Sequence, residues 1–148
     1  MLQISPTVAS DESDWRRLWR EYLAFYGTER AEEVYARSFA RIIDPEVTEY
    51  TGLIARQNGR AIGIANLIFH FHGWQTTEVC YLQDLYVASD VRGAGVGRAL
   101  LQAVFNAADA AGRPDVYWLT QADNAAARQL YDSMGTLTPF VKYRRPAS

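Results

Sequence analysis

The sequence predicts an α+β fold, in which a mixed, mostly antiparallel sheet contains one parallel βαβ pair near its middle. Apolar residues recur at helical spacing over residues 15–43, alternate with a period of two over residues 51–87, and then follow an alternation of helix and strand. The predicted order of elements is β-α-α-β-β-β-α-β-α-β. The chain has 148 residues, with 49% hydrophobic and 22% charged side chains, so residues 1–148 are expected to form a single domain.

The first third of the chain is expected to hold an edge strand and two helices. Leu2–Val8 has the character of a strand, and Pro6 favours an edge position because proline cannot donate a backbone hydrogen bond. Apolar side chains follow helical spacing over Trp15–Tyr26, which Gly27 ends, and again over Ala31–Ile43.

The middle of the chain predicts an antiparallel meander. Thr51–Gln57 and Arg60–His72 alternate as strands on either side of Asn58-Gly59, a pair of residues typical of a two-residue type I′ turn. Thr77–Val87 continues the alternation as a third strand.

The last third predicts a crossover and a closing strand. Gly97–Ala111 and Asn124–Met134 have the composition of helices, and Val116–Thr120 between them predicts a short central strand. Thr138–Arg144 is expected to be the final strand. A parallel pair beside a splayed strand leaves a crevice for a ligand at the carboxyl ends of the strands.

Composition excludes several classes of protein. The net charge of −2 argues against a general nucleic-acid binder, and no apolar run approaches the roughly 20 residues that cross a bilayer. The N-terminus lacks the basic and apolar regions of a signal peptide, so a cytoplasmic location without membrane or nucleic-acid partners is expected. The single cysteine, Cys80, excludes a disulfide within the chain and a zinc site of several cysteines.

The strongest local signal is a glycine-rich junction between a strand and a helix. Gly93, Gly95 and Gly97 alternate there, and glycine lets a ligand approach the backbone closely. The N–H groups at a helix start, together with Arg92 and Arg98, favour a pyrophosphate. No Gly-Lys-Ser/Thr follows, as an NTPase loop requires, and the spacing G-x-G-x-G differs from the dinucleotide fingerprint. A glycine-rich turn without a ligand remains the alternative.

Two motifs give the chain a family resemblance. The stretch R-G-A-G-V-G, Arg92 to Gly97, resembles the acetyl-CoA signature R/Q-x-x-G-x-G/A of the GCN5-related N-acetyltransferases, the GNAT superfamily. The stretch DNAAARQLYDSMG, Asp123 to Gly135, resembles the second motif of the superfamily, N-x-x-A-x-x-L-Y followed by glycine. The stretches YLQDLYV, VYWLTQADN and PFVKYRR resemble its histone- and polyamine-acetyltransferase branch. The likeness is good over residues 77–145, and earlier residues match only in the order of elements.

The resemblance implies acetyl-CoA as co-substrate, no metal, and a coenzyme lying between the strand that ends at Val87 and the strand at Val116. The pantetheine arm is expected along the backbone of Leu85, Tyr86 and Val87, and a bulge near Asp84 and Leu85 is expected to aim an N–H at the thioester oxygen. The remaining coenzyme contacts are expected from Arg92, Gly93, Ala94, Gly95, Val96, Gly97, Arg98, Asn124, Ala127 and Tyr131.

The resemblance also implies catalytic roles. Tyr131 is the candidate general acid for the departing thiolate, and core packing is its alternative role. Related polyamine enzymes often carry glutamate where this chain has Gln83, which cannot act as a base. Asp84 and Glu78 are the candidate bases, each through water, and surface or turn positions are their alternatives. Asn124 is expected to cap a helix, contact the coenzyme, or both.

The predicted reaction is acetyl transfer to a primary amine of a small molecule, such as a diamine, polyamine or amino acid, by direct attack in a ternary complex. The alternatives are a protein lysine or N-terminal acetyltransferase and a non-catalytic acyl-CoA-binding module. Cys80 is expected to be inert core, and His70 and His72 a polar strand face without a metal. The stripe Trp15, Trp19, Tyr22, Tyr26 is expected mainly in the core, with its C-terminal end beside the acceptor. Aromatic-rich edges and a free final strand predict a homodimer.

Overall fold

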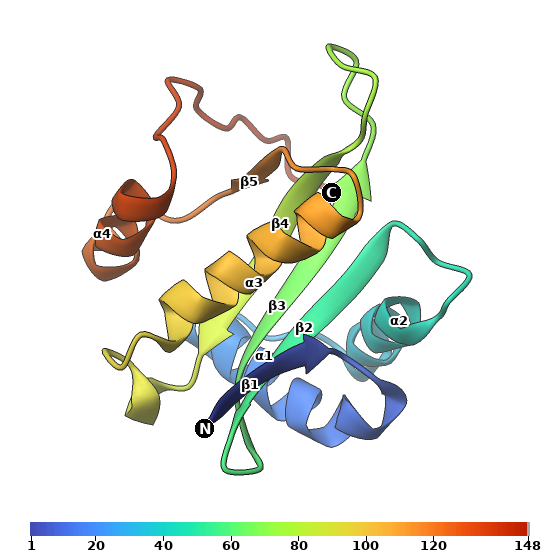
Figure 1. Cartoon of the computed structure of the whole chain (residues 1–148), viewed down its shortest axis with the longest axis vertical. Helices are drawn as coiled ribbons and strands as arrows, with labels where there is room; N and C mark the ends of the chain where they lie inside the picture. Colours follow the sequence, from blue (N-terminus) through green and yellow to red (C-terminus); the bar gives the residue numbers. More distant parts are fainter. Residues whose placement is uncertain (148) are drawn as a thin grey trace.

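The computed structural model describes residues 1–147 and confirms the α+β class (Figure 1). The strands are β1 (Leu2–Pro6), β2 (Tyr50–Gln57), β3 (Arg60–His70), β4 (Val79–Val87) and β5 (Val116–Trp118). The helices are α1 (Glu12–Phe25), α2 (Glu32–Ile43), α3 (Val96–Ala110) and α4 (Ala125–Met134), with short 3-10 turns at Ala9–Asp11 and Ser89–Val91. The strands lie in the order β1-β2-β3-β4-β5; the first three pairs are antiparallel, and β4 and β5 are parallel.

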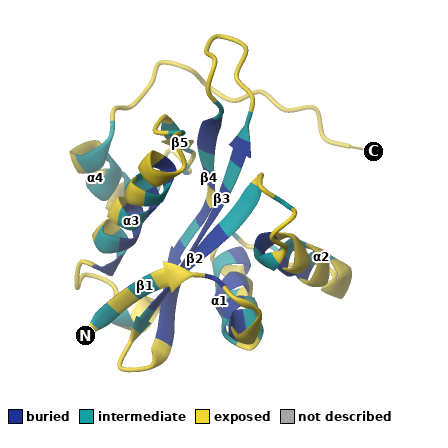
Figure 2. Cartoon of the chain, turned by 45° about the vertical axis from the view of Figure 1, so that its right-hand side comes forward, coloured by how far each residue is buried: buried dark blue, intermediate teal, exposed yellow. Residues whose placement is uncertain are grey.

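The sheet separates two apolar cores, because both of its faces are covered by helices. On one face α3 packs Leu100 and Val104 against strand residues such as Leu67. On the other face α1 and α2 bring Trp15 and Phe39 onto Ile64. Figure 2 shows the buried residues concentrated on the strands and on the inward sides of these helices. None of the helices in residues 1–147 is long and apolar enough to cross a bilayer.

The β2–β3 hairpin turns where the sequence predicts it. Asn58 and Gly59 both have positive φ, 52° and 81°, as a type I′ turn requires. The β2–β3 pairing brings Asn66 opposite Gly52, and the separate β3–β4 pairing brings Asn66 opposite Asp84. The two pairings together place Asn66 and Asp84 side by side, and both residues reappear at the candidate site.

The expectation of a final strand over Thr138–Arg144 is wrong within the described chain. Residues 136–147 follow α4 as an exposed segment without strand pairing, and they run away from the body of the molecule (Figure 2). As a consequence, the parallel β4–β5 pair lies at one end of the sheet and not near its middle. Alternating apolar residues predict that a segment can form a strand, but they do not specify the edge that it joins.

The feature that positions the site is the splay between β4 and β5. The two strands pair only over Cys80–Leu82 and Val116–Trp118, whereas β4 continues to Val87. Among the described residues 1–147, no strand lies beside the outer edge of β4 from Gln83 onward. Helix α4, which follows β5, has no fully buried residue.

Candidate active site

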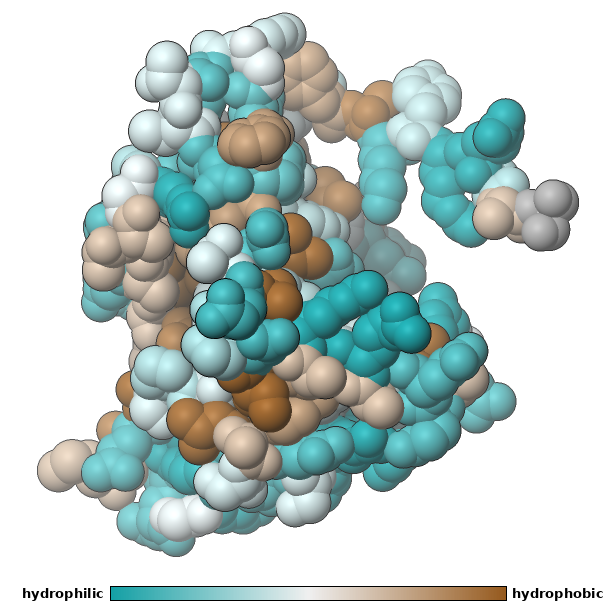
Figure 3. Space-filling model, turned by 90° about the vertical axis from the view of Figure 1, so that its right-hand side faces the viewer, coloured by the Kyte–Doolittle hydropathy of each residue, from teal (hydrophilic) through white to brown (hydrophobic). Residues whose placement is uncertain are grey.

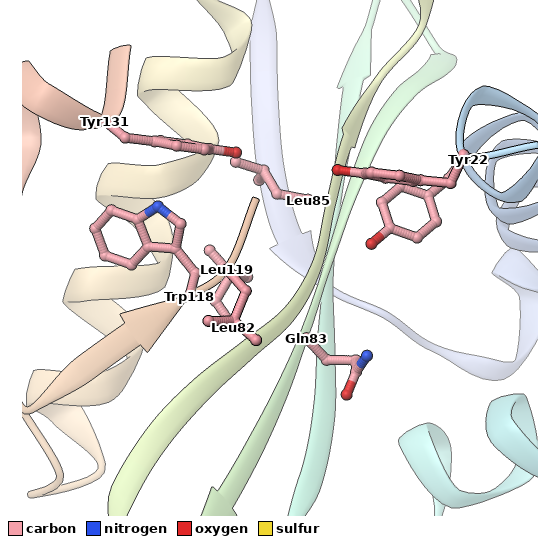
Figure 4. Close-up of a pocket in the computed structure, with 8 residues that line it drawn as sticks. Tyr22, Leu82, Gln83, Leu85, Trp118, Leu119 and Tyr131 are labelled. Atoms are coloured by element: carbon pink, nitrogen blue, oxygen red, sulfur yellow. The ribbon is translucent and has the colours of Figure 1, made fainter. Parts of the chain in front are cut away.

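A pocket lies where β4 and β5 separate (Figure 4). Four elements contribute its walls: α1 with the residue after it, β4, the end of β5, and α4. The lining residues are Tyr22, Tyr26, Leu82, Gln83, Leu85, Trp118, Leu119 and Tyr131. The pocket therefore combines the N-terminal helix with the C-terminal motif, two parts of the chain about a hundred residues apart.

Tyr131 forms one wall of this pocket. Its ring meets the Trp118 ring edge to face, with the centroids 5.5 Å apart. Figure 4 shows its hydroxyl directed across the opening toward Leu85, while Tyr22 enters from the opposite wall. Burial, followed by the influence of Tyr26, raises the pKa of Tyr131 to about 12. The phenol is therefore held in its protonated form, as a proton donor must be.

The glycine loop leads directly into α3. Gly93 and Gly95 have φ of 85° and 83°, a conformation that other residues rarely adopt, and both residues are exposed. The Ala99 N–H donates to the Gly95 carbonyl at 3.0 Å and so forms an early hydrogen bond of α3. The N–H groups before Ala99, in the first helical turn, have no carbonyl within the helix to donate to. The loop thus presents free donors at a helix N-terminus, an arrangement suited to a pyrophosphate.

Two of the candidate coenzyme residues on this loop are arginines. The Nε of Arg92 donates to the Val87 carbonyl at 3.0 Å, and its guanidinium lies 5.3 Å from the centre of the Tyr86 ring. Arg98 donates to the Ser133 hydroxyl at 2.8 Å and thereby ties α3 to α4. Both side chains are exposed at the loop, where they add positive charge.

Gly97 brings α3 close to its neighbours. A Cβ at this position would lie 3.4 Å from Leu130 and 3.9 Å from Val87. Val96, just before it, is buried in the α3 core, and Ala94 is exposed with the glycines. Glycine at 97 therefore allows the close approach of α3 to α4, a role different from that of Gly95.

Asn124 caps α4. Its Oδ1 accepts from the Ala127 N–H at 3.4 Å, and its amide donates to the Thr120 hydroxyl at 3.2 Å. The helix-cap role predicted for Asn124 is thus present. Asn124 and Ala127 both lie half-buried at the start of the helix that carries Tyr131.

The backbone of β4 is irregular at the opening. Asn66 pairs with Asp84 and Leu67 with Leu82, so Gln83 is an extra residue in β4 and forms a bulge. The expected bulge near Asp84 and Leu85 is present, one residue earlier. Gln83 is exposed at the pocket, and Asp84 is turned to the side of the sheet that α1 covers.

Asp84 belongs to a buried polar network. The Asn66 amide donates to Asp84 Oδ2 at 2.9 Å, and Trp15 Nε1 donates to Asn66 Oδ1 at 3.1 Å. Only 4% of Asp84 is exposed, and Asn66 is fully buried. Burial raises the pKa of the Asp84 carboxyl, and the hydrogen bond from Asn66 opposes that rise. The same charge contributes, after burial, to the raised pKa of Tyr22.

Glu78 does not lie with the other candidates. Its carboxylate forms a 2.8 Å ion pair with Arg113, just after α3, and neither residue lines the pocket. Glu78 precedes β4, and six residues of extended strand, about 20 Å, separate it from Asp84. The structure therefore brings Asp84 near the pocket but leaves Glu78 at the opposite end of the strand.

The three predicted pantetheine contacts, Leu85, Tyr86 and Val87, all lie on the part of β4 beyond the β5 pairing. Leu85 and Val87 are half-buried toward α3. The Tyr86 side chain is committed to the other face, where its hydroxyl donates to Glu21 at 3.1 Å. Tyr86 can therefore contribute only its backbone to a ligand in the opening.

Cys80 and the two histidines stand outside the pocket lining. Cys80 is fully buried, and burial raises the pKa of its thiol to about 11, which disfavours the reactive thiolate. The Nε2 of His70 lies 2.8 Å from the Tyr117 hydroxyl. Residues 1–147 contain no cluster of three side chains suited to a metal ion.

Sequence reasoning missed Trp118 and Leu119 as pocket residues and Asn66 as the partner of Asp84. Trp118 and Leu119 lie within an apolar stretch that predicts an ordinary buried strand. They line the pocket only because β4 and β5 separate at this point. The single polar residue Asn66 within the apolar run of β3 was the available signal, since a buried amide requires a partner.

Comparison with known proteins agrees with this geometry. The model of the acetyltransferase (GNAT) family matches residues 14–136. The chain is 41% identical over 136 residues to the D-amino-acid N-acetyltransferase HPA3 of Saccharomyces cerevisiae, covering 91% of this chain and 84% of that protein. It is 31% identical over 146 residues to the uncharacterized N-acetyltransferase YhfO of Bacillus subtilis, covering 96% and 95% of the two chains.

Solved structures share the fold. The structure of AAC(6')-Iy in complex with the bisubstrate analog CoA-S-monomethyl-acetylneamine has a TM-score of 0.86 at 18% identity, and the match covers 100% of this chain and 99% of that chain. Because the family model covers most of the chain and a relative exceeds 40% identity, the family is established. The chain belongs to the GNAT family of acetyltransferases and is an N-acetyltransferase.

Proposed function

We propose that this N-acetyltransferase moves the acetyl group of acetyl-CoA to a primary amine of a small molecule by direct attack in a ternary complex. Acetyl-CoA is the co-substrate. The observation that carries the proposal is the half-buried, protonated phenol of Tyr131, which faces the unpaired edge of β4 across the opening between β4 and β5.

In the proposed complex, acetyl-CoA occupies this opening. The N–H groups of Gly93 to Arg98 hold the pyrophosphate, with Arg92 and Arg98 supplying charge. The pantetheine arm pairs with the backbone of Leu85 to Val87 as an added strand. Asn124 and Ala127, at the start of α4, line the route toward Tyr131. A backbone N–H at the Gln83 bulge polarises the thioester oxygen.

The chemical step balances with the residues of this site. The neutral amine attacks the thioester carbonyl, a C–N bond forms, and the C–S bond breaks with its electron pair leaving on sulfur. Tyr131 donates its proton to that thiolate, the attached ammonium loses one proton to water, and a proton from the solvent restores the Tyr131 phenol before the next turnover. Since the amine attacks directly, no nucleophilic side chain is required, which agrees with the buried thiol of Cys80.

The proton acceptor that we assign is Asp84, acting through water. Its raised pKa makes it a stronger base than an ordinary carboxylate, and it lies one residue from the pocket-lining Gln83. Glu78 is left out of the proposal because its ion pair with Arg113 holds it at the other end of β4.

A small acceptor is supported by the pocket and by the relative HPA3, which is a D-amino-acid N-acetyltransferase. Tyrosine, tryptophan, leucine and glutamine side chains line the pocket, and its walls include no Asp, Glu, Lys or Arg. Aromatic faces attract an ammonium group by a cation–π interaction, which is weak enough for the amine to dissociate. This lining suits a compact amine better than a long acidic or basic peptide.

The experiment is a screen of coenzyme A release with matched acceptors. The panel contains D- and L-amino acids, diamines, polyamines, an aminoglycoside, and peptides with a free lysine or a free N-terminus. We expect the highest kcat/KM on a small amine, at least about tenfold above any peptide, a difference of about 1.4 kcal/mol. Tyr131→Phe is the control for enzyme-catalysed release. A peptide as the best acceptor would overturn the small-molecule proposal, and release unchanged in the control would overturn the site.

A further inference from the structure

Helix α4, which carries Tyr131, is only lightly packed against the rest of the molecule. None of its residues is fully buried, and residues 136–147 beyond it stand clear of the molecule (Figure 3). We propose that Trp118 is a positioning residue for Tyr131, and that the missing side chain of Gly135 provides the room in which the indole of Trp118 fixes the phenol. This role rests on the proposed function, in which Tyr131 donates a proton.

The Trp118 indole contacts both helices that flank β5. On α4 it meets the Tyr131 ring at a centroid distance of 5.5 Å and an interplanar angle of 68°. On α3 it meets the Phe105 ring at 5.9 Å and 40°. Figure 4 shows the indole beside Tyr131 on the same wall of the pocket. A displacement of the indole therefore disturbs its contact with the phenol.

Gly135, the residue after α4, makes room for this indole. A Cβ at Gly135 would lie 2.9 Å from Cη2 and 3.2 Å from Cζ2 of Trp118. The backbone of Gly135 is extended, with φ −146° and ψ −173°, so the glycine is required for space and not for an unusual conformation. Carbon atoms pack at about 3.5–4.0 Å, so a methyl group here requires the indole or the end of α4 to move by about 0.5–1 Å.

Such a movement reaches Tyr131 by two routes. One is the ring contact with Trp118, and the other is the last turn of α4, where the Gly135 N–H donates to the Tyr131 carbonyl at 2.8 Å. A proton donor must lie within about 2.6–3.2 Å of the atom that it protonates. A misplacement of about 1 Å can cost about 100-fold in rate. The packing of Trp118 against Gly135 is therefore close enough to control catalysis by Tyr131.

The first test adds the methyl group. Gly135→Ala is expected to lower kcat by about 10- to 100-fold and to leave the acetyl-CoA Kd within about threefold, because the glycine loop lies on another element. Gly73→Ala is the matched control, since Gly73 lies between β3 and β4, has no positive φ and has nothing within 4 Å of a Cβ. The control is expected to keep its kcat. A Gly135→Ala kcat within about threefold of wild type, measured on the folded fraction, overturns the proposal.

Double-mutant cycles separate positioning from general damage. In the Tyr131→Phe background, Gly135→Ala is expected to cause no further fall in kcat, because the hydroxyl that it misplaces is already absent. In the Trp118→Phe background it is also expected to cost nothing, because phenylalanine lacks the ring that holds Cζ2 and Cη2. General damage lowers kcat by the same factor in every background, and that result in either cycle overturns the proposal.

A second cycle applies if Gly135→Ala does not fold. Trp118→Phe loosens the contact with Tyr131 directly, and it is expected to lower kcat about tenfold when the hydroxyl is present and by less than about twofold in Tyr131→Phe. Equal losses in the two backgrounds overturn the positioning role and leave the proposed function intact. A normal kcat in Tyr131→Phe alone overturns the proposed function, and the positioning role with it.

Discussion

At the scale of single residues, the Tyr131 hydroxyl is the group on which the proposed chemistry depends. Tyr131→Phe keeps the ring that meets Trp118 and removes only the hydroxyl. General-acid catalysis is typically worth about 10² to 10⁴-fold, so kcat is expected to fall in that range while the acetyl-CoA Kd and Tm stay unchanged. Steady-state kinetics and calorimetry measure these quantities. A kcat within about threefold of wild type, or a lower Tm with normal kcat in the folded fraction, would assign Tyr131 to packing.

The pKa of Tyr131 makes a related prediction for the pH profile. Because burial raises this pKa to about 12, the phenol stays protonated through neutral and moderately alkaline pH. The rate is therefore expected to rise as the acceptor amine, whose pKa is near 10, loses its proton, and not to fall again below about pH 10. The profile of kcat against pH checks this. A basic limb below about pH 10 that disappears in Tyr131→Phe would contradict the protonated phenol.

Asp84 carries a prediction about stability. Its folded pKa is raised, so the stability it contributes is present below about pH 4, its unfolded pKa, and is lost as the pH rises through the raised value. Asp84→Asn removes the buried charge and is expected to have a higher Tm than wild type at pH 7, with the difference closing toward pH 4. Thermal unfolding between pH 4 and pH 7 measures it.

Asp90 is the matched control with the opposite sign. It is exposed and forms a 2.8 Å ion pair with Arg60, which lowers the pKa of its carboxyl. Its stabilising contribution is therefore present above its unfolded pKa and lost as the pH falls through the lowered value. Asp90→Asn is expected to lower Tm slightly at pH 7. An Asp84→Asn variant that behaves like Asp90→Asn would show that hydrogen bonds outweigh burial at Asp84.

At the scale of elements, two glycines with positive φ can be compared. One lies in the loop before α3 and is expected to bind the coenzyme, whereas the other only forms a turn. Gly95 has a φ of 83° with open space around its Cβ position, and Gly59 in the β2–β3 turn has a φ of 81° in equally open space. Valine at either position is expected to destabilise by about 1–2 kcal/mol through left-handed backbone strain. Only Gly95→Val is expected to abolish acetyl-CoA binding, because its side chain stands among the free N–H groups.

Titration calorimetry with acetyl-CoA, together with thermal unfolding of both variants, makes the comparison. Equal losses of Tm with binding lost in Gly95→Val alone support the assignment of the loop. Normal acetyl-CoA affinity in Gly95→Val would remove the loop from the coenzyme site.

At the scale of the whole molecule, the order of the reaction tests whether the two substrates meet in one complex. Double-reciprocal plots of initial rate are expected to intersect, and Cys80→Ala is expected to keep most of the activity because the thiol is buried in the α3 core. Initial-rate kinetics at varied concentrations of both substrates provide the measurement. Parallel lines, or an acetyl group trapped on Cys80, would instead indicate a covalent enzyme intermediate.

Local signals in the sequence predicted most of the fold. The period-two alternation and Asn58-Gly59 located the meander, and helical spacing located α1 and α2 to within a few residues. These features depend on backbone conformation and on which side of an element is apolar, and both are encoded by neighbouring residues. The prediction of a final strand was wrong because residues such as Phe140 and Val141 favour an extended conformation but do not specify a partner, and no strand of the described sheet pairs with residues 138–144.

The same division holds for the site. The sequence by itself singled out the glycine loop and Tyr131 as site candidates, because a motif of fixed spacing carries each of them, and their roles stay predictions. Only the tertiary structure decided that Trp118 and Tyr22 share a pocket, that Asp84 is buried against Asn66, and that Glu78 is held away by Arg113. The physical reason is that the opening exists only because β4 extends beyond the residues that pair with β5. Contacts made across such an opening join residues that are far apart in the chain, so no local pattern records them.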